Sequence, residues 1–183
     1  MILPIFAYGS KVLRKKADDV DSTYPELAAL IENMWTTMYH AQGVGLAAPQ
    51  VGHSIRLFII DTIQLNKEED ETGGIKQVFI NPEKMKENGE QWTYEEGCLS
   101  IPNVRGDVDR PEKVILSYYD ENFVQHTQEF ENIEARVIQH EFDHLEGILF
   151  TQHLKPVKRR LIKRKLENIR KGDVDVEYPM VFV

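Results

Sequence analysis

The segment His140-Glu141-Phe142-Asp143-His144 constrains the fold of this 183-residue chain more than any other feature. Two histidines at positions i and i+4 lie on one face of an α-helix, one turn apart, so both imidazoles can reach the same cation. Glu141 is offset by one residue, where a carboxylate can accept a proton from water that the cation has acidified. The pattern therefore predicts a helix that carries a metal-dependent hydrolase site, with Glu141 as the catalytic base.

Apolar residues at helical spacing, together with signals for helix ends, predict three helices. They are expected over residues 24–41, from residue 132 until Gly147 can end the helix, and over about residues 156–170. The metal motif falls on the second of them.

Between the first two helices the pattern changes to short runs rich in β-forming residues, with turn-prone residues such as Asn88-Gly89 between them. Strands are expected at residues 55–60, 77–81, 93–101, 113–119 and 123–130, and a closing strand at 174–183. Residues 66–74 are acidic and contain glycine, which predicts an exposed loop. These elements predict an α+β fold in which helices pack on small antiparallel sheets around the helix that carries the metal motif.

The length of the chain fits one domain, residues 1–183, and no repeat or linker divides it. No apolar run is long enough to cross a membrane, and the N-terminus lacks the features of a secretory signal. Cys98 is the only cysteine, which excludes an intrachain disulfide and fits a reducing compartment. We therefore expect a cytoplasmic protein.

Charge is distributed unevenly along the sequence. Nine Lys or Arg and one Glu lie between residues 155 and 171, whereas the whole chain has a net charge of −8. An acidic protein is not expected to bind nucleic acid stably. The basic segment is expected to form a helix packed through its apolar residues, with its charges in water.

Two histidines leave a catalytic metal one protein ligand short, and the third ligand separates the classes of enzyme. A third histidine six residues after His144 would indicate one class of protease, but Phe150 occupies that position and cannot coordinate. A downstream Glu would indicate a zinc endopeptidase, and Glu167 is at a workable separation. The remaining candidate is Cys98, whose neighbour Gly97 permits a close backbone approach and whose neighbour Leu99 offers a backbone N–H.

Three motifs resemble those of the peptide deformylase family, whose members remove the formyl group from the formyl-methionine of new bacterial proteins. The motifs occur in the family's order, and the similarity extends from about Pro4 to about Leu154. They are Gly43-Val44-Gly45-Leu46-Ala47-Ala48-Pro49-Gln50, Glu96-Gly97-Cys98-Leu99-Ser100, and Gln139-His140-Glu141-Phe142-Asp143-His144.

The resemblance implies that Cys98, His140 and His144 bind a divalent metal, usually Fe(II) in this family, with Zn or Ni able to replace it. It implies that Glu141 is the general base and then the acid. It also implies that the Gln50 side chain and the Leu99 backbone N–H hold the formyl oxygen.

The resemblance further implies which residues surround the substrate. Glu96 is expected to pair with Arg105, and the stem of Arg136 is expected to line the pocket while its charge reaches water. Some relatives also contact the ribosome through a basic C-terminal helix. The residues expected around the formyl-methionyl peptide are Val44, Gly45, Tyr94, Glu96, Gly97, Ile133, Arg136, Val137 and His140.

Overall fold

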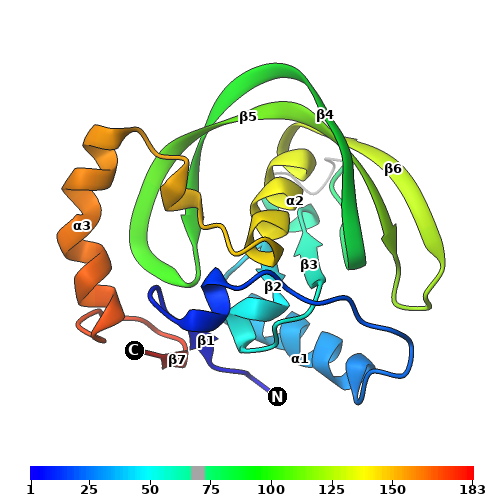
Figure 1. The fold of residues 1–183 in the computed structure, drawn as a ribbon, viewed down its shortest axis with the longest axis horizontal. Coiled ribbons are helices and arrows are strands. Elements are labelled where there is room, and N and C mark those ends of the chain that lie inside the picture. Colours follow the sequence, from blue (N-terminus) through cyan, green and yellow to red (C-terminus); the bar gives the residue numbers. More distant parts are fainter. Residues whose placement is uncertain (67–72) are drawn as a thin grey trace.

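The computed structural model describes residues 1–66 and 73–183, and it contains a five-stranded antiparallel sheet in the order β2-β3-β4-β5-β6 (Figure 1). A separate parallel pair joins β1 to β7. The predicted α+β class is therefore confirmed. The elements are β1 (Ile5–Phe6), α1 (Leu27–His40), β2 (Gly45–Ala47), β3 (Leu57–Asp61), β4 (Lys76–Cys98), β5 (Ile101–Tyr119), β6 (Gln125–Glu131), α2 (Asn132–Leu145), α3 (Pro156–Arg170) and β7 (Met180–Val181).

Strand β3 separates two hydrophobic cores because successive side chains of a strand point to opposite faces. Leu57 and Ile59 pack with the apolar face of α1. Phe58 and Ile60 pack with α2 and the outer strands. With both faces covered, every residue of β3 is buried. Helix α2 therefore lies in the middle of the molecule, beneath the arch that β4 and β5 form (Figure 1).

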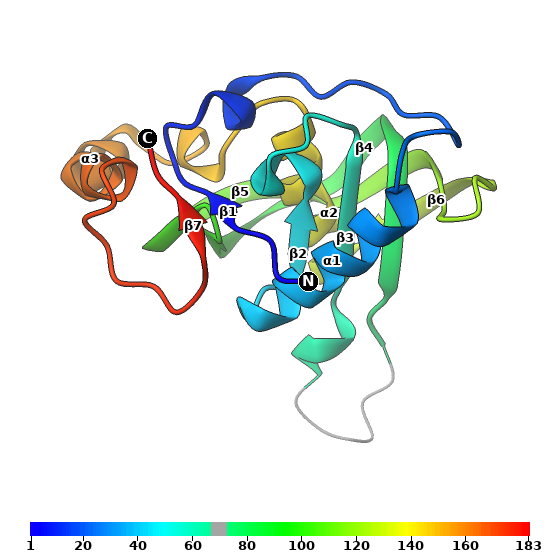
Figure 2. The same ribbon diagram turned by 90° about the horizontal axis from the view of Figure 1, so that it is seen from below.

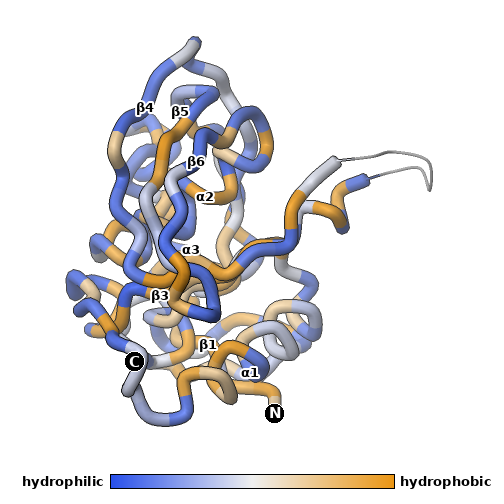
Figure 3. The backbone as a smooth tube through the Cα atoms, turned by 90° about the vertical axis from the view of Figure 1, so that its right-hand side faces the viewer, coloured by the Kyte–Doolittle hydropathy of each residue, from blue (hydrophilic) through white to orange (hydrophobic). Residues whose placement is uncertain are grey.

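The sheet contains longer strands than the sequence pattern predicted. The strand expected at residues 77–81 and most of the strand expected at 93–101 are parts of β4, which runs without a break from Lys76 to Cys98. Residues 99 and 100 form a turn, and Ile101 begins β5. Asn88-Gly89 was expected to be a turn, but it forms an irregularity in the pairing with β5, with Gly89 at φ +84°. A bulge absorbs the glycine without ending the strand. Residues 83–91 are mostly exposed, and β4 is mostly hydrophilic in Figure 3.

The first helix begins later than predicted. Asp21 accepts a hydrogen bond from the Thr23 backbone N–H (2.8 Å), which forms a local turn in place of a helix cap. Helix α1 then begins at Leu27, after Glu26 in a left-handed conformation. The loop predicted at residues 66–74 falls largely outside the described residues.

The C-terminal region contains the predicted third helix, α3, at the edge of the molecule (Figure 2). It buries only Ile162 and Ile169, which pack against β5. The predicted strand at 174–183 is wrong for most of its length, because only Met180–Val181 pairs, with β1. Within the described residues, no helix has the length and apolar character needed to cross a membrane.

Candidate metal centre

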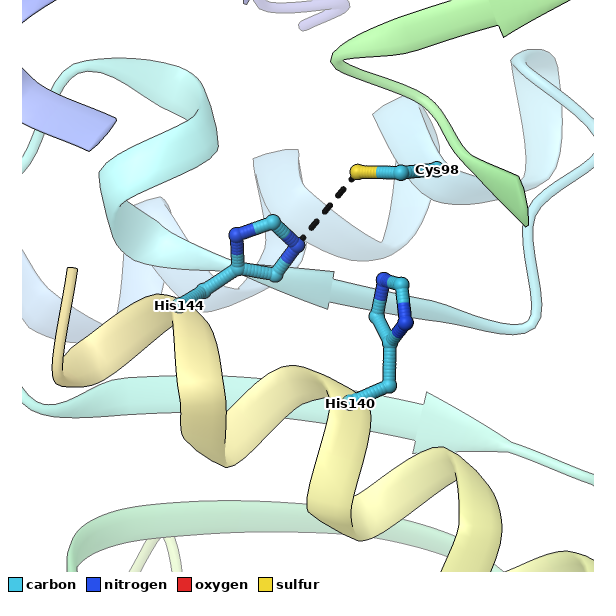
Figure 4. Close-up of side chains that lie close together, drawn as sticks. All are labelled: Cys98, His140 and His144. Carbon is cyan, nitrogen blue, oxygen red and sulfur yellow. Dashed lines mark hydrogen bonds between the residues drawn. The ribbon is translucent and has the colours of Figure 1, made fainter. Parts of the chain in front are cut away.

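Three side chains from two segments that are far apart in the sequence converge between α2 and the end of β4 (Figure 4). Single ligand atoms of Cys98, His140 and His144 all lie within 4.8 Å of one another. Cys98 Sγ lies 3.4 Å from His144 Nε2. Helix α2 supplies both histidines, and the last residue of β4 supplies the thiol. The structure thus brings together the two-histidine motif and the third ligand that the family resemblance implied.

His140 is oriented by a buried carboxylate. Its Nδ1 lies 2.9 Å from Glu96 Oε2, so Nε2 is left to face the cluster. Glu96 also accepts two hydrogen bonds from Arg110, at 2.7 and 3.1 Å. Arg110 in turn donates to Asp143 (2.8 Å). A carboxylate that accepts the second ring N–H of a ligating histidine is the usual support of a protein metal site.

Two predictions about neighbouring arginines are wrong. Arg105 does not pair with Glu96 but lies 3.7 Å from Glu95 on the surface. Arg136 does not reach water, because it is 1% exposed and donates to Glu96 (3.0 Å) and to the backbone oxygens of Val108 and Trp92. A buried guanidinium needs hydrogen-bond acceptors, and the strongest acceptor is a carboxylate. Glu96 is the buried carboxylate that accepts from both Arg110 and Arg136.

The three converging side chains fit a divalent metal with affinity for nitrogen and sulfur. Burial lowers the pKa of His144 to about 3, so its ring is neutral and can donate a lone pair. Burial opposes a charge on His140, but the adjacent Cys98 and Glu96 raise its pKa well above the ordinary value. A cation at this position would take the place of the proton on His140.

Glu141 lies beside this cluster in an unusual environment. Its Oε2 is buried and has no hydrogen-bond partner among the described residues. Burial, the largest effect, raises the pKa of Glu141 to about 7. Strand β2 approaches so closely that a Cβ on Gly45 would collide with the Glu141 carboxylate. Gly45 is thus required for the carboxylate to occupy its position.

Gln50 lies beside the cluster and is 2% exposed. Its Oε1 accepts a hydrogen bond from the Ala47 backbone N–H (2.9 Å), which fixes the orientation of the amide. Its Nε2 then lies 3.4 Å from Cys98 Sγ and 3.3 Å from Ser100 Oγ. The amide N–H groups are therefore directed at the centre of the site.

A cleft of about 1110 Å³ opens onto these groups. It is lined by every residue that the family resemblance placed around the substrate, although Glu96 and Arg136 are themselves buried behind its wall. The sequence analysis missed one wall of this cleft, which residues 175–178 of the C-terminal segment form. Only the strand-like pattern of 174–183 hinted that this segment is ordered.

Tyr178 in this wall donates a hydrogen bond from its hydroxyl to the Leu99 backbone oxygen (2.8 Å). Burial and the negative charge of nearby Cys98 raise the pKa of Tyr178 above its usual range, so the hydroxyl remains protonated. Nothing in the sequence pairs these two residues, which are 79 positions apart.

Glu167, the third ligand that an endopeptidase would need, does not belong to the cluster. It lies on α3 and pairs with Arg170 (2.7 Å) and Lys171 (3.3 Å) of the same helical turn. Helix α3 lies at the edge of the molecule, apart from α2, in both Figure 1 and Figure 2. The endopeptidase alternative is therefore not favoured.

Comparisons with known proteins give the same answer as the geometry. Residues 2–160 match the family model of polypeptide deformylase. The peptide deformylase of Christiangramia forsetii is 54% identical over 189 residues, which cover 100% of this chain and 96% of the relative. The peptide deformylase of Cytophaga hutchinsonii is 48% identical, with 100% and 98% covered.

Solved structures agree with this assignment. The peptide deformylase of Legionella pneumophila superposes with a TM-score of 0.82 at 38% identity, covering 94% of this chain and 98% of the other. That of Synechococcus elongatus, solved with actinonin, gives a TM-score of 0.78 at 36% identity, covering 99% and 92%. The chain therefore belongs to the polypeptide deformylase family, the metalloenzymes that remove the N-terminal formyl group from nascent peptides.

Proposed function

We propose that Cys98, His140 and His144 hold one divalent metal, and that Glu141 acts beside it as the general base in hydrolysis of the formyl group. The convergence of three ligand atoms within 4.8 Å, beside an unpaired buried carboxylate, carries this proposal. When bound, the metal would supply a positive charge that polarises the formyl carbonyl and acidifies water.

Glu141 then has two tasks in sequence. It accepts a proton from the water that attacks the formyl carbon, and it returns this proton to the leaving amine of methionine. Burial raises the pKa of Glu141 above the ordinary carboxyl value, so its carboxylate is a stronger base than an exposed one. Gly45 keeps the carboxylate against the metal cluster by leaving room for it.

The formyl oxygen gains negative charge as water attacks, and we propose that two donors stabilise it. They are the Gln50 side-chain amide and the Leu99 backbone N–H. The Gln50 amide cannot turn away, because the Ala47 N–H holds its oxygen. Donors that are fixed before the reaction stabilise a developing charge without a cost of reorganisation.

The methionine side chain is proposed to lie in the apolar part of the cleft, against Val44, Tyr94, Ile133 and Val137. Backbone groups of Gly45 and Gly97 would align the peptide. Glu96 and Arg136 lie behind this surface and keep its shape, so their role toward substrate is indirect.

We propose Fe(II) as the physiological metal, with Zn or Ni able to replace it. A thiolate with two imidazoles suits these ions better than Mg²⁺ or Ca²⁺, which prefer oxygen ligands. An iron–thiolate site that opens onto a cleft is sensitive to oxidation, so activity with Fe(II) should be lost in air. Elemental analysis of protein purified without oxygen tests the choice of metal.

The direct test of the function is formate release from a short formyl-methionyl peptide. We expect release by protein loaded with Fe(II) or Ni(II), loss of release after chelation, and recovery after the metal is returned. The matching acetyl-methionyl peptide should react far more slowly, because the methyl group must fit beside Gln50 and Leu99. Absence of formate release by the metal-loaded protein would overturn the proposal.

We also propose that residues 1–183 form one cytoplasmic domain and that α3 contacts the ribosome transiently. Both ends of the chain are joined in the β1–β7 pair, and Ile162 and Ile169 attach α3 to β5. The charges of α3 are mostly exposed, as a surface for phosphate requires. Cosedimentation with ribosomes that weakens steeply with salt supports this contact, and no cosedimentation at low salt would refute it.

A further inference from the structure

The turn that joins β4 to β5 carries the thiol of the site, yet its conformation is not one that two-residue hairpin turns favour. Cys98 pairs with Ile101, so Leu99 and Ser100 are the two central residues of the turn. Two-residue hairpin turns are usually of the types that need a positive φ, because those follow the twist of the strands. Neither Leu99 nor Ser100 has a positive φ. The pairing is also irregular between Gly97 and Cys98.

Contacts from outside the hairpin hold this turn in place. Gln50 Nε2 lies 3.3 Å from Ser100 Oγ, and the Tyr8 backbone N–H donates to the Ser100 oxygen (2.8 Å). The Tyr178 hydroxyl donates to the Leu99 oxygen (2.8 Å). That oxygen belongs to the middle peptide unit of the turn, and the Leu99 N–H belongs to the peptide unit before it, so the two groups are joined through the Leu99 Cα.

Tyr178 is itself fixed at several points. Asn103 Nδ2 donates to the Asp175 backbone oxygen (3.1 Å), which ties the C-terminal segment to β5. The Ile5 backbone N–H donates to the Pro179 oxygen (2.8 Å), directly after Tyr178. The next residues along the chain, Met180 and Val181, form the parallel pairing of β7 with β1. The phenol is therefore presented from a well-anchored segment, and the two ends of the chain together set its position.

We propose that Tyr178 is a positioning residue for deformylation: its hydroxyl holds the Leu99 carbonyl, which restrains the position of Leu99 and thereby the direction of the Leu99 N–H toward the formyl oxygen. This inference rests on the role of the Leu99 N–H in the proposed function. A donor must be close to its final orientation before reaction to stabilise the developing charge, and small displacements are costly. The C-terminal segment is on this account part of the catalytic apparatus and not only a wall.

Tyr178→Phe tests the proposal because it removes the hydroxyl and keeps the ring. We expect kcat for a formyl-methionyl peptide to fall about tenfold, as for loss of one buried hydrogen bond, while KM and metal content stay unchanged. Backbone amides of residues 97–101 should exchange with deuterium faster than in the wild type. A matched control is Tyr118→Phe, which loses a part-buried hydrogen bond from its hydroxyl to Gln128 of β6 (3.3 Å), and should leave kcat and this exchange unchanged.

Three results would overturn the inference. They are an unchanged kcat, a rise in KM alone, which would make Tyr178 a substrate contact, or a fall in kcat that merely follows loss of metal. A failure of the oxyanion assignment itself is recognised separately with Gln50→Ala and with the wild type. If Gln50→Ala keeps full kcat, or the wild type releases no formate, the proposed function is wrong whatever Tyr178→Phe does.

Discussion

Helices α2 and α3 have nearly the same length, 14 and 15 residues, but opposite relations to the protein. Ten residues of α2 are buried, and half of these are polar or charged, whereas α3 buries only Ile162 and Ile169. On α2, Arg136 and Asp143 have fixed partners in the interior and Glu141 is buried with one oxygen unpaired, whereas most charges on α3 are exposed. Charged side chains can therefore control chemistry where they are buried, as on α2. Where they are exposed, as on α3, they affect little more than solubility and the binding of charged partners.

The largest effect is expected at Glu141 on α2. Glu141→Gln keeps the size of the side chain but removes the base, so kcat should fall about 10²–10⁴-fold with the metal still bound. Formate release and metal content, measured on the same preparation, check this. Full activity in the metal-loaded variant would show that Glu141 is not the base.

The second largest effect is expected at Gly45 of β2, which leaves room for the Glu141 side chain of α2. Gly45→Ala places a methyl group against the Glu141 carboxylate and should lower kcat about 10²-fold by displacing the base. Gly43→Ala is a useful comparison, because its added Cβ meets the end of the Leu99 side chain at 2.8 Å, which can move. Equal losses in the two variants would contradict a specific clash with Glu141.

Two arginines sharpen the contrast between buried and exposed charge. Arg136→Met leaves the backbone oxygens of Val108 and Trp92 without a donor, and should lower the free energy of unfolding by about 1–3 kcal/mol. Arg105→Met removes only a surface ion pair, in which the Arg105 side chain is 67% exposed and that of Glu95 is 60% exposed. It should lower the free energy of unfolding by less than about 0.5 kcal/mol. Urea unfolding of both variants measures the difference. Similar costs would mean that burial does not govern these charges.

The smallest effect is expected on α3. Arg170 and Lys171 lower the pKa of Glu167 to about 2. A depressed carboxyl pKa stabilises the fold above the unfolded value, about 4.3, and this contribution is lost as pH falls toward 2. Glu167→Gln should therefore lower Tm slightly at pH 7, not at pH 2, and should leave kcat unchanged. Loss of metal or of activity in this variant would revive Glu167 as a ligand.

The sequence predicted both helices because their patterns are local. Apolar spacing and end signals located α3 with the bounds that the structure has, and the family motifs identified the residues of the metal cluster. The partner of Glu96 could not be predicted in this way. It depends on which arginine the pairing of β4 with β5 and the packing of α2 bring inside, and these are Arg110 and Arg136 rather than Arg105.

The sequence did not predict the strand boundaries or the C-terminal wall of the cleft, for a related reason. Asn88-Gly89 has the composition of a turn, but pairing with β5 on both sides carries the strand through it. Tyr178 lies in a segment with little regular structure, and its contact with Leu99 arises only from the meeting of the chain ends. Long-range pairing decided both features, and no local pattern records it.

The central claim is that Cys98 joins two histidines of α2 at one metal, and cobalt tests it most directly. A thiolate bound to Co(II) gives a charge-transfer absorption, and Cys98 is the only cysteine in the chain, so the band has a single possible source. We predict this band in the Co(II)-loaded wild type and in Glu141→Gln, and its absence in Cys98→Ser. The same spectrum in Cys98→Ser as in the wild type would contradict the account.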